Sequence, residues 1–319
     1  MKTESVLEKV LVSGELAVTG ECGPPRGALP EVVKEKAALL KGYVDAVNVT
    51  DNQTAMVRMS SFAASVFLRQ MDLHPVFQMV CRDRNRLAMQ SDIIGAYSHG
   101  INTMLCLSGD HPKFGDHPMA ANVHDLDSMQ LIQTVRGMRD EGRFQGGAEI
   151  KNPPKMFIGA AANPFADPFE LRVARLAKKV KAGVDFVQTQ CIYNIDKFET
   201  WMKGVRDRGL HEKVYVMAGI TPMKSVGMAR YMKNKVPGMD VPDELVERMG
   251  RVPKEKQAQE GIDICVESIQ RLRRSKGWPG FISWPSSGRR KYPRSWSEAA
   301  SIRGRRYNHR GMPGTRRQL

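Results

Sequence analysis

Two carboxylates near the ends of apolar runs are the residues best placed to do chemistry. Glu21 stands near the end of the run LAVTGEC, just before a Gly-Pro-Pro bend that fixes the direction of the chain. Partial burial there would raise the pKa of this carboxyl and suit it to donate a proton near neutral pH. Asp110 ends LCLSGD, where Ser108 and Gly109 let backbone N–H groups approach an anion or a heterocycle. The simpler alternative for each carboxylate is a role in a surface turn.

Two amides and one lysine are candidates for ligand binding. Gln188 and Gln190 in FVQTQ share one side of a strand, because alternate residues face the same way. Side-chain amides match the donor and acceptor edge of a pterin, although an amide stack inside a barrel is the alternative. Lys179 in LAKKVKAG is placed to reach a phosphate or to remain a solvated helix cation.

Other polar residues also follow apolar runs, and in a barrel such positions converge on one face. They are Thr50, Asp51, Asn52, Gln78, Arg82, Asp83, Asn163 and Thr221.

The elements that must position these residues alternate between apolar runs and amphipathic stretches, a pattern typical of parallel β/α units. The expected strands are Leu16–Cys22, Ala46–Thr50, Val76–Cys81, Met104–Ser108, Met156–Ala161, Phe186–Gln190 and Val214–Gly219. The expected helices include Pro30–Lys41, Ala55–Met71, Arg86–His99, Leu126–Glu141, Pro168–Ala182 and Lys254–Arg273.

Residues typical of helix starts precede two of the expected helices, and a residue typical of helix ends follows one of them. Asp167 before Pro168 is typical of an N-cap, Asp196 precedes another helical segment, and Gly183 suits a helix end.

The composition changes near Arg273. Residues 271–319 hold 14 of the 49 Lys and Arg but only Glu298 of the 34 acids, so residues 1–270 carry a net charge of only +2 out of +15. We expect a barrel domain over residues 1–272 and a basic tail over 273–319 that is disordered or out of frame.

Codon overlap offers a test of the tail. In a shifted reading frame, each new codon joins the last base of one codon to the first two bases of the next. Synonymous codons for RRSKGWPGFISWPSSGRRKYP exist that read as EVEGLAGVHIMAIEWEEKIP in this shifted frame. VHIMAI would be an eighth strand, followed by the start of an acidic helix. We therefore predict a (β/α)8 TIM barrel whose last β/α unit is lost or garbled by a frameshift. An authentic basic arm that binds RNA or another polyanion is the alternative.

Composition excludes several classes of protein. No apolar run is long enough to span a membrane and no signal layout is present, so a cytoplasmic location is expected. Five scattered cysteines suggest buried thiols rather than disulfides or zinc. The spacing of the histidines does not match a metal site. The sequence contains no G-x-G-x-x-G loop, so a dinucleotide-binding fold is not expected.

Residues 10–270 resemble the methylenetetrahydrofolate reductase family. The matching motifs are the strand-end glutamate before Pro24-Pro25, VNVTDN, LCLSGD, GAAANPFADP, LAKKVKAGVDFVQTQ and AGITPM. The resemblance implies a flavin-holding barrel in which Glu21 is the acid that opens the folate ring to an iminium cation. It implies that Asp110 stabilises this cation and that Gln190, beside Gln188, binds the pterin.

The resemblance also implies a cofactor and partners. Flavin-contact positions are Thr50, Gln78, Ser108, Gly109, Asp110, Asn163, Asp167 and Lys179. The cofactor would be FAD, with FMN also open because Asp167 replaces a histidine. The substrate would be 5,10-methylenetetrahydrofolate. The protein is expected to form an oligomer and is not expected to bind nucleic acid.

The chain departs from the family where aromatic residues usually follow the pterin glutamine. Cys191, Ile192 and Tyr193 stand there, and Cys22 and Gly23 follow Glu21 at positions where aromatic residues are also common in the family. Because flat rings would stack a nicotinamide on the flavin, we hypothesise that electrons come from an iron–sulfur partner rather than directly from NAD(P)H. A folate-binding methyltransferase barrel that passes methyl groups to a corrinoid and a basic-tailed RNA-binding protein are the alternative functions.

Overall fold

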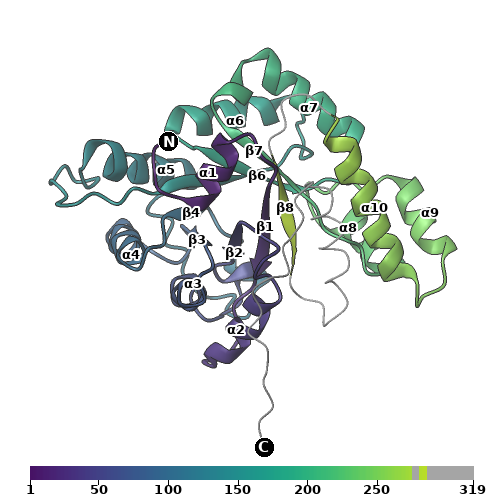
Figure 1. The fold of residues 1–319 in the computed structure, drawn as a ribbon, viewed down its shortest axis with the longest axis horizontal. Coiled ribbons are helices and arrows are strands. Elements are labelled where there is room, and N and C mark those ends of the chain that lie inside the picture. Colours follow the sequence, from purple (N-terminus) through teal and green to yellow (C-terminus); the bar gives the residue numbers. More distant parts are fainter. Residues whose placement is uncertain (275–279, 286–319) are drawn as a thin grey trace, which may run out of the picture.

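The computed structural model describes residues 1–274 and the backbone of residues 280–285, which form a closed barrel of eight parallel strands (Figure 1). Each strand pairs with its neighbour in the chain, and the eighth also pairs with the first. The strands are β1 (Ala17–Cys22), β2 (Ala46–Val49), β3 (Pro75–Val80), β4 (Thr103–Leu107), β5 (Phe157–Ala162), β6 (Phe186–Cys191), β7 (Tyr215–Gly219) and β8 (Gly280–Pro285). The predicted barrel is confirmed.

The last β/α unit was expected to be lost or garbled, and the structure places a strand, β8, at its position. Gly280 of β8 lies opposite Ala17 of β1 and Met217 of β7. The barrel is therefore closed by residues of the given amino-acid sequence, without a shift of the reading frame. Glycine and proline at the two ends of this segment hide the strand in the sequence. The strand VHIMAI of the overlapping frame falls on the codons of residues 280–286, so both frames place a strand at this point. The helix expected after it lies outside the described residues.

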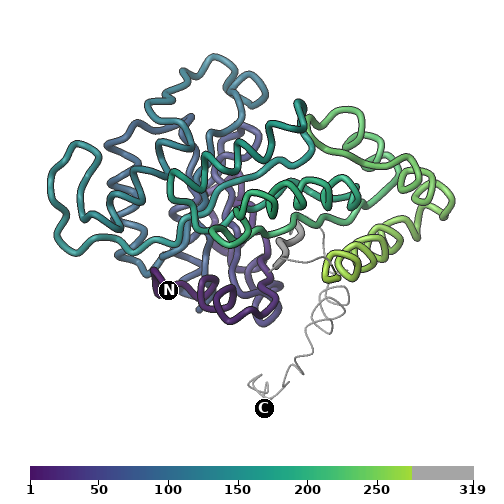
Figure 2. Tube along the Cα trace, turned by 90° about the horizontal axis from the view of Figure 1, so that it is seen from above, coloured from purple at the N-terminus to yellow at the C-terminus, as the bar shows by residue number. Residues whose placement is uncertain are grey.

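Helices surround the barrel, and the last three gather on one side of it (Figures 1 and 2). The α-helices are α1 (Val6–Val12), α2 (Pro30–Ala38), α3 (Ser61–Gln70), α4 (Arg86–Ser98), α5 (Ser128–Arg136), α6 (Leu171–Ala182), α7 (Ile195–Asp207), α8 (Val226–Lys235), α9 (Asp243–Arg251) and α10 (Gln257–Leu272). Short helical turns are η1 (Gln53–Ala55), η2 (Pro112–Phe114), η3 (Gly137–Glu141) and η4 (Leu210–Glu212).

Several helix boundaries differ from the sequence predictions. Asp167 is not an N-cap, because α6 begins only at Leu171 and its N-cap position is Glu170. Asn194 caps α7 by accepting from the Lys197 amide, which places Asp196 inside the first turn. Likewise α3 starts after its N-cap Ser60, so residues 56–60 are not helical.

One predicted boundary is confirmed. Gly183 ends α6 with a φ of 111°, a conformation that L side chains rarely adopt.

Two apolar layers hold the barrel together. Inward-facing side chains at the amino-terminal ends of the strands form a small cluster that α1 covers with Leu7 and Leu11. The members contributed by the strands are Ala17, Ala46, Val76, Leu105, Phe157, Phe186 and Met217. A larger cluster lies between the strands and the surrounding helices. The amino-terminal end of the barrel is therefore sealed, which leaves the carboxyl end for a ligand.

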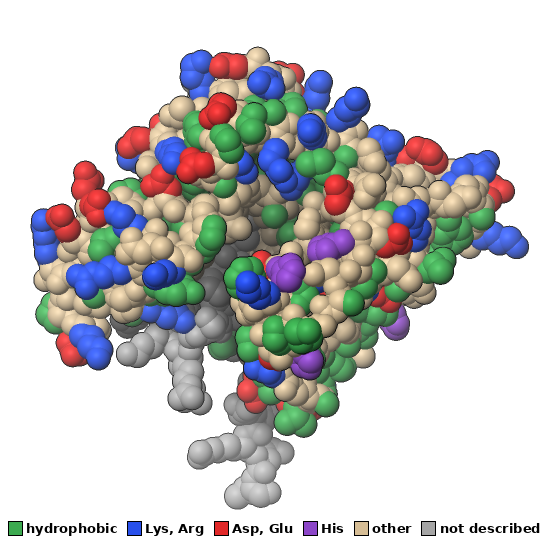
Figure 3. All heavy atoms as spheres, turned by 180° about the vertical axis from the view of Figure 1, so that it is seen from behind, with side chains coloured by type: hydrophobic (Ala, Val, Ile, Leu, Met, Phe, Trp, Pro, Cys, Tyr) green, Lys and Arg blue, Asp and Glu red, His purple; other side chains and the backbone are tan. Residues whose placement is uncertain are grey.

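The remaining bulk properties agree with the composition. The five cysteines are free thiols and only Cys191 is partly exposed, as expected. Over the face shown in Figure 3, cationic and anionic side chains are interspersed, in keeping with the small net charge of residues 1–270. Within the described ranges, no helix is long and apolar enough to cross a membrane.

Candidate active site

Polar side chains from the ends of β1 to β4 line a pocket of about 270 Å³. Parallel strands end at the same face of a barrel, which brings these sequence-distant residues together. The members singled out from the sequence as site residues are Glu21, Thr50, Gln78, Ser108, Gly109 and Asp110. Six further residues complete the lining: Asp51, Asn52, Gln53, Val80, Arg82 and Leu107. We refer to this space as the strand-end pocket.

Glu21 has the protonation behaviour that a general acid needs. Burial raises the pKa of its carboxyl to about 6, while the charge of Lys36 on α2 acts in the opposite direction. The Lys36 Nζ is held nearby, because it donates to the Gly23 carbonyl at 2.7 Å. A carboxyl with this pKa is protonated in about half of the molecules at pH 6 and in about a tenth at pH 7, so it can act as a proton donor near neutral pH.

Asp110 stands at the mouth of the same pocket on a tight loop. Gly109 has a φ of 91°, and a Cβ at this position would lie 3.1 Å from the Cβ atoms of Arg82 and Val80. Only glycine therefore lets the loop approach β3 so closely. The Asp110 carboxylate is exposed and accepts a hydrogen bond from the Thr54 amide at 3.2 Å. It is free to face a positively charged ligand atom.

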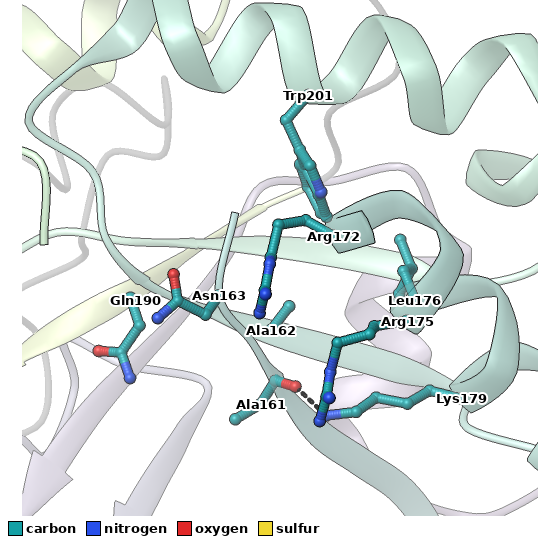
Figure 4. Close-up of a pocket in the computed structure, with 9 residues that line it drawn as sticks. All are labelled: Ala161, Ala162, Asn163, Arg172, Arg175, Leu176, Lys179, Gln190 and Trp201. Carbon is teal, nitrogen blue, oxygen red and sulfur yellow. Dashed lines mark hydrogen bonds between the residues drawn. The ribbon is translucent and has the colours of Figure 1, made fainter. Parts of the chain in front are cut away.

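A second pocket lies beside the ends of β5 and β6, and we call it the cationic pocket (Figure 4). It contains Asn163, Lys179 and Gln190 of the predicted site. Arg172 and Arg175 of α6 line it as well, and every charged residue of the lining is a cation. Such a pocket suits an anionic group, above all a phosphate.

Lys179 is drawn toward the barrel rather than into solvent. Its Nζ donates a hydrogen bond to the Ala161 carbonyl at the end of β5 (Figure 4). Burial, assisted by the charge of Arg175, lowers the pKa of Lys179 to about 8. The ammonium is therefore ready to be stabilised by an anionic ligand.

Two of the predicted site residues lie outside both pocket linings. Gln188 is 7% exposed inside the barrel, and its Nε2 atom has no hydrogen-bond partner within the part of the chain that the structure describes. Asp167 precedes α6, and its carbonyl accepts from the Arg172 Nη2 at 2.7 Å. Asp167 thus contacts an arginine of the cationic pocket through its backbone.

Sequence reasoning missed the two arginines of the cationic pocket. Arg172, Arg175 and Lys179 are spaced three and four residues apart, so one face of a helix carries all three. This spacing was visible in the sequence and would have identified an anion site. Arg82 was noted only as a polar strand-end residue, since its hydrogen bonds depend on loops far apart in the chain.

The fold and these pockets define a class of protein. The chain is a (β/α)8 barrel with a carboxylate-bearing pocket and an adjoining cationic pocket at the carboxyl ends of its strands. Residues 6–281 match the family model described as methylenetetrahydrofolate reductase, and the chain belongs to this family.

Curated relatives agree with the family at modest identity. Methylenetetrahydrofolate reductase 2 of Schizosaccharomyces pombe is 24% identical over 235 residues, which are 70% of this chain and 34% of that protein. A probable methylenetetrahydrofolate reductase (NADPH) of Caenorhabditis elegans is 21% identical over 282 residues, which are 83% of this chain and 39% of that protein. The chain therefore spans between a third and two fifths of the length of these relatives.

Solved structures share the fold. An uncharacterized protein from Clostridium thermocellum that binds two copies of 5-methyl-5,6,7,8-tetrahydrofolic acid has a TM-score of 0.61 at 12% identity, covering 93% of this chain and 99% of its own. A riboflavin lyase solved with modified FMN and riboflavin has a TM-score of 0.57 at 9% identity, covering 90% and 91%. Both likenesses concern the barrel alone.

Proposed function

We propose that this protein reduces 5,10-methylenetetrahydrofolate to 5-methyltetrahydrofolate with the help of a bound flavin. The observation that carries the proposal is the presence of Glu21 and Asp110 in one pocket, where burial raises the pKa of Glu21 to about 6. One group that can give up a proton and one that carries negative charge are what this reaction requires of the protein.

The residues present fit a flavin. Among the described residues, the buried Thr50 Oγ1 and Gln188 Nε2 atoms have no hydrogen-bond partner, and polar ring atoms of a ligand would satisfy them. Gly109 lies in the lining of the strand-end pocket, and its lack of a side chain lets this loop stay close against Val80 and Arg82. The cationic pocket would hold the phosphate end of the cofactor. When bound, the flavin supplies the hydride.

The protein's own groups would act on the folate. Glu21 donates a proton to the folate nitrogen that leaves as the five-membered ring opens, which generates an iminium cation at the other nitrogen. The Asp110 carboxylate stabilises this cation electrostatically. Gln190, at the edge of the cationic pocket, binds the pterin through its amide, and Gln188 lies two residues before it on the same side of β6.

The cationic pocket favours FAD over FMN. Arg172, Arg175 and Lys179 bring three positive charges to one space, and FAD carries two linked phosphates where FMN carries one. Asn163 and the loop of Asp167 lie at the same end of α6 and would complete this binding site. Release of the cofactor by heat, followed by chromatography against FAD and FMN standards, identifies it.

The reductant of the flavin is proposed to be an iron–sulfur partner. Beyond Gln190 the chain turns into the core: Ile192 and Tyr193 are 2% and 5% exposed, and the Tyr193 hydroxyl donates to the Thr221 carbonyl at 2.8 Å. These side chains are therefore held away from a nicotinamide at the pocket. NAD(P)H is the alternative, and the C. elegans relative carries NADPH in its name. Rapid bleaching of the flavin by NADH or NADPH alone would exclude the partner hypothesis.

A single-turnover experiment tests the function itself. The protein is loaded with flavin, reduced photochemically without oxygen, and mixed with 5,10-methylenetetrahydrofolate. We expect the flavin to reoxidise while one equivalent of 5-methyltetrahydrofolate forms. Glu21→Gln should slow this step by about 100-fold or more, because positioned proton donors contribute that much. A flavin that stays reduced in the wild type contradicts the proposal.

A further inference from the structure

Arg82 lies beneath the loops that follow β2, β3 and β4, and its guanidinium binds to each of them. The residue is 3% exposed. Its Nε and Nη2 atoms donate to the two carboxylate oxygens of Asp83 at 2.6 and 2.7 Å. Its Nη1 donates to the Asp110 carbonyl at 2.9 Å and its Nη2 to the Asn52 carbonyl at 3.3 Å. One planar group therefore joins three strand-end loops.

The three loops depend on the planar shape of the Arg82 guanidinium rather than on its charge. Asp83 pairs with the guanidinium through both oxygens, so the positive charge is largely neutralised within the pair. The outward edge of the guanidinium then reaches two carbonyls that lie 58 residues apart in the chain. A lysine ammonium has no such rigid fork and cannot donate to the same set of acceptors in the same directions.

The bonds of Arg82 fix the backbone at the Asp110 loop. Gly109 packs against the Arg82 Cβ, and the next carbonyl accepts from its guanidinium, so the same side chain contacts two consecutive residues. The Asp110 carboxylate in turn accepts from the Thr54 amide, in the loop that starts at Asn52. Movement of Arg82 would displace both the aspartate and the group that orients it.

We propose that Arg82 is a positioning residue that sets where the Asp110 carboxylate stands against the substrate. The inference rests on the proposed function, in which Asp110 stabilises the folate cation. Electrostatic stabilisation depends on preorganised groups, and a misplacement of about 1 Å from a change away from the chemistry can cost roughly 100-fold in rate.

The test is the Arg82→Lys variant, with Arg84→Lys as its matched control. Arg84 is also part of the ionic network, but its bonds go to Asp51 at 2.7 Å and Asp92 at 3.1 Å. For Arg82→Lys we expect kcat to fall roughly 10- to 100-fold while KM for the folate changes less than about threefold. The control should stay within about twofold of the wild type in kcat.

A double variant separates positioning from a general structural role. In an Asp110→Asn background, Arg82→Lys should lower kcat by less than about a further twofold, because residues that act through one another are not additive. Full multiplication of the two single effects, or an equal loss in Arg84→Lys, overturns the positioning role.

A second variant tests the inference if the Arg82→Lys protein does not fold. Asp83→Asn weakens the two bonds that orient the guanidinium, and it should lower kcat roughly three- to tenfold with the same dependence on Asp110. An Asp83→Asn enzyme with wild-type kcat contradicts the inference. A wild type without single-turnover activity would instead refute the proposed function, so the two failures are distinguishable.

Discussion

At the scale of single residues, two side chains have surroundings that shift their pKa values. The Glu21 carboxyl is stabilised in its neutral form by burial, and the Lys179 ammonium is destabilised in its charged form by burial. Both shifts oppose the charge that each group carries in water at neutral pH. Each one therefore predicts a measurable dependence on pH.

Glu21→Gln should stabilise the protein at high pH while it removes activity. The folded-state pKa of about 6 lies above the ordinary glutamate pKa of 4.5, so the folded protein loses stability as pH rises through this window. The shift corresponds to about 2 kcal/mol at pH 8 and to less than about 1 kcal/mol at pH 5. Urea unfolding of wild type and variant at the two pH values measures the difference. An equal stability of the two proteins at pH 8 would show that Glu21 is not desolvated.

Lys179 should make flavin binding weaken at alkaline pH. Its pKa of about 8 in the free protein means that above this pH a proton must be taken up before the ammonium can pair with a phosphate. We expect the Kd for the flavin to rise up to about tenfold per pH unit above pH 8. Titration of flavin fluorescence from pH 7 to pH 10 measures it. The Lys179→Met variant should bind more weakly and lose this dependence, and a persistent dependence in the variant would assign it to another group.

At the scale of elements, the residues that stabilise the barrel and the residues of the candidate site lie at opposite ends of it. Helix α1 covers the amino-terminal end with Leu7 and Leu11, which are 0% and 2% exposed, while both pockets lie at the carboxyl end. Substitutions at the two ends should therefore have separable effects.

Leu7→Ala should destabilise the fold and spare the site. Removing a fully buried leucine costs about 2–5 kcal/mol through lost burial and the cavity left behind. The Leu87→Ala variant is the control, because this leucine on α4 is 75% exposed and should change stability by less than about 0.5 kcal/mol. Urea unfolding gives the stability, and the spectrum of the bound flavin reports the site. A Leu7→Ala protein with full stability would mean that α1 does not seal the barrel.

The elements also show what the sequence could predict. Seven strands were visible as apolar runs, because both faces of a parallel barrel strand are buried. Their polar ends located the members of the strand-end pocket. The cap at Asp167 was predicted wrongly because α6 begins only at Leu171, so the Asp-Pro pair that is typical of a helix start lies before the helix. The role of Arg82 needed the tertiary structure, since its acceptors lie on separate loops.

At the scale of the whole molecule, the tail remains the unusual feature. The family match ends at residue 281, within β8, and the basic composition begins near the same place. The overlapping frame offers VHIMAI, a run rich in β-branched residues without proline, at the position where the printed frame has GFISWP. A barrel strand with two neighbours suits the first sequence better, because proline cannot donate to a ladder.

Resequencing the gene across the codons for Gln270 to Trp284 tests the frameshift. We expect a change in the number of bases that restores VEGLAGVHIMAIEW, and the corrected protein should unfold at a higher urea concentration than the printed chain. An unchanged frame would make the basic tail authentic. Polyanion binding that weakens with salt and disappears on deletion of residues 286–319 would then be the property to measure.

The most direct test of the proposed reaction is the visible spectrum of the purified, flavin-loaded protein under anaerobic conditions as 5-methyltetrahydrofolate is added. The reaction is reversible in principle, so the product should return its hydride and bleach the oxidised flavin, and Asp110→Asn should slow the bleaching. An absorbance that does not change in the wild type would contradict the assignment of this barrel as a flavin-dependent methylenetetrahydrofolate reductase, and so would a folded protein that cannot be loaded with flavin.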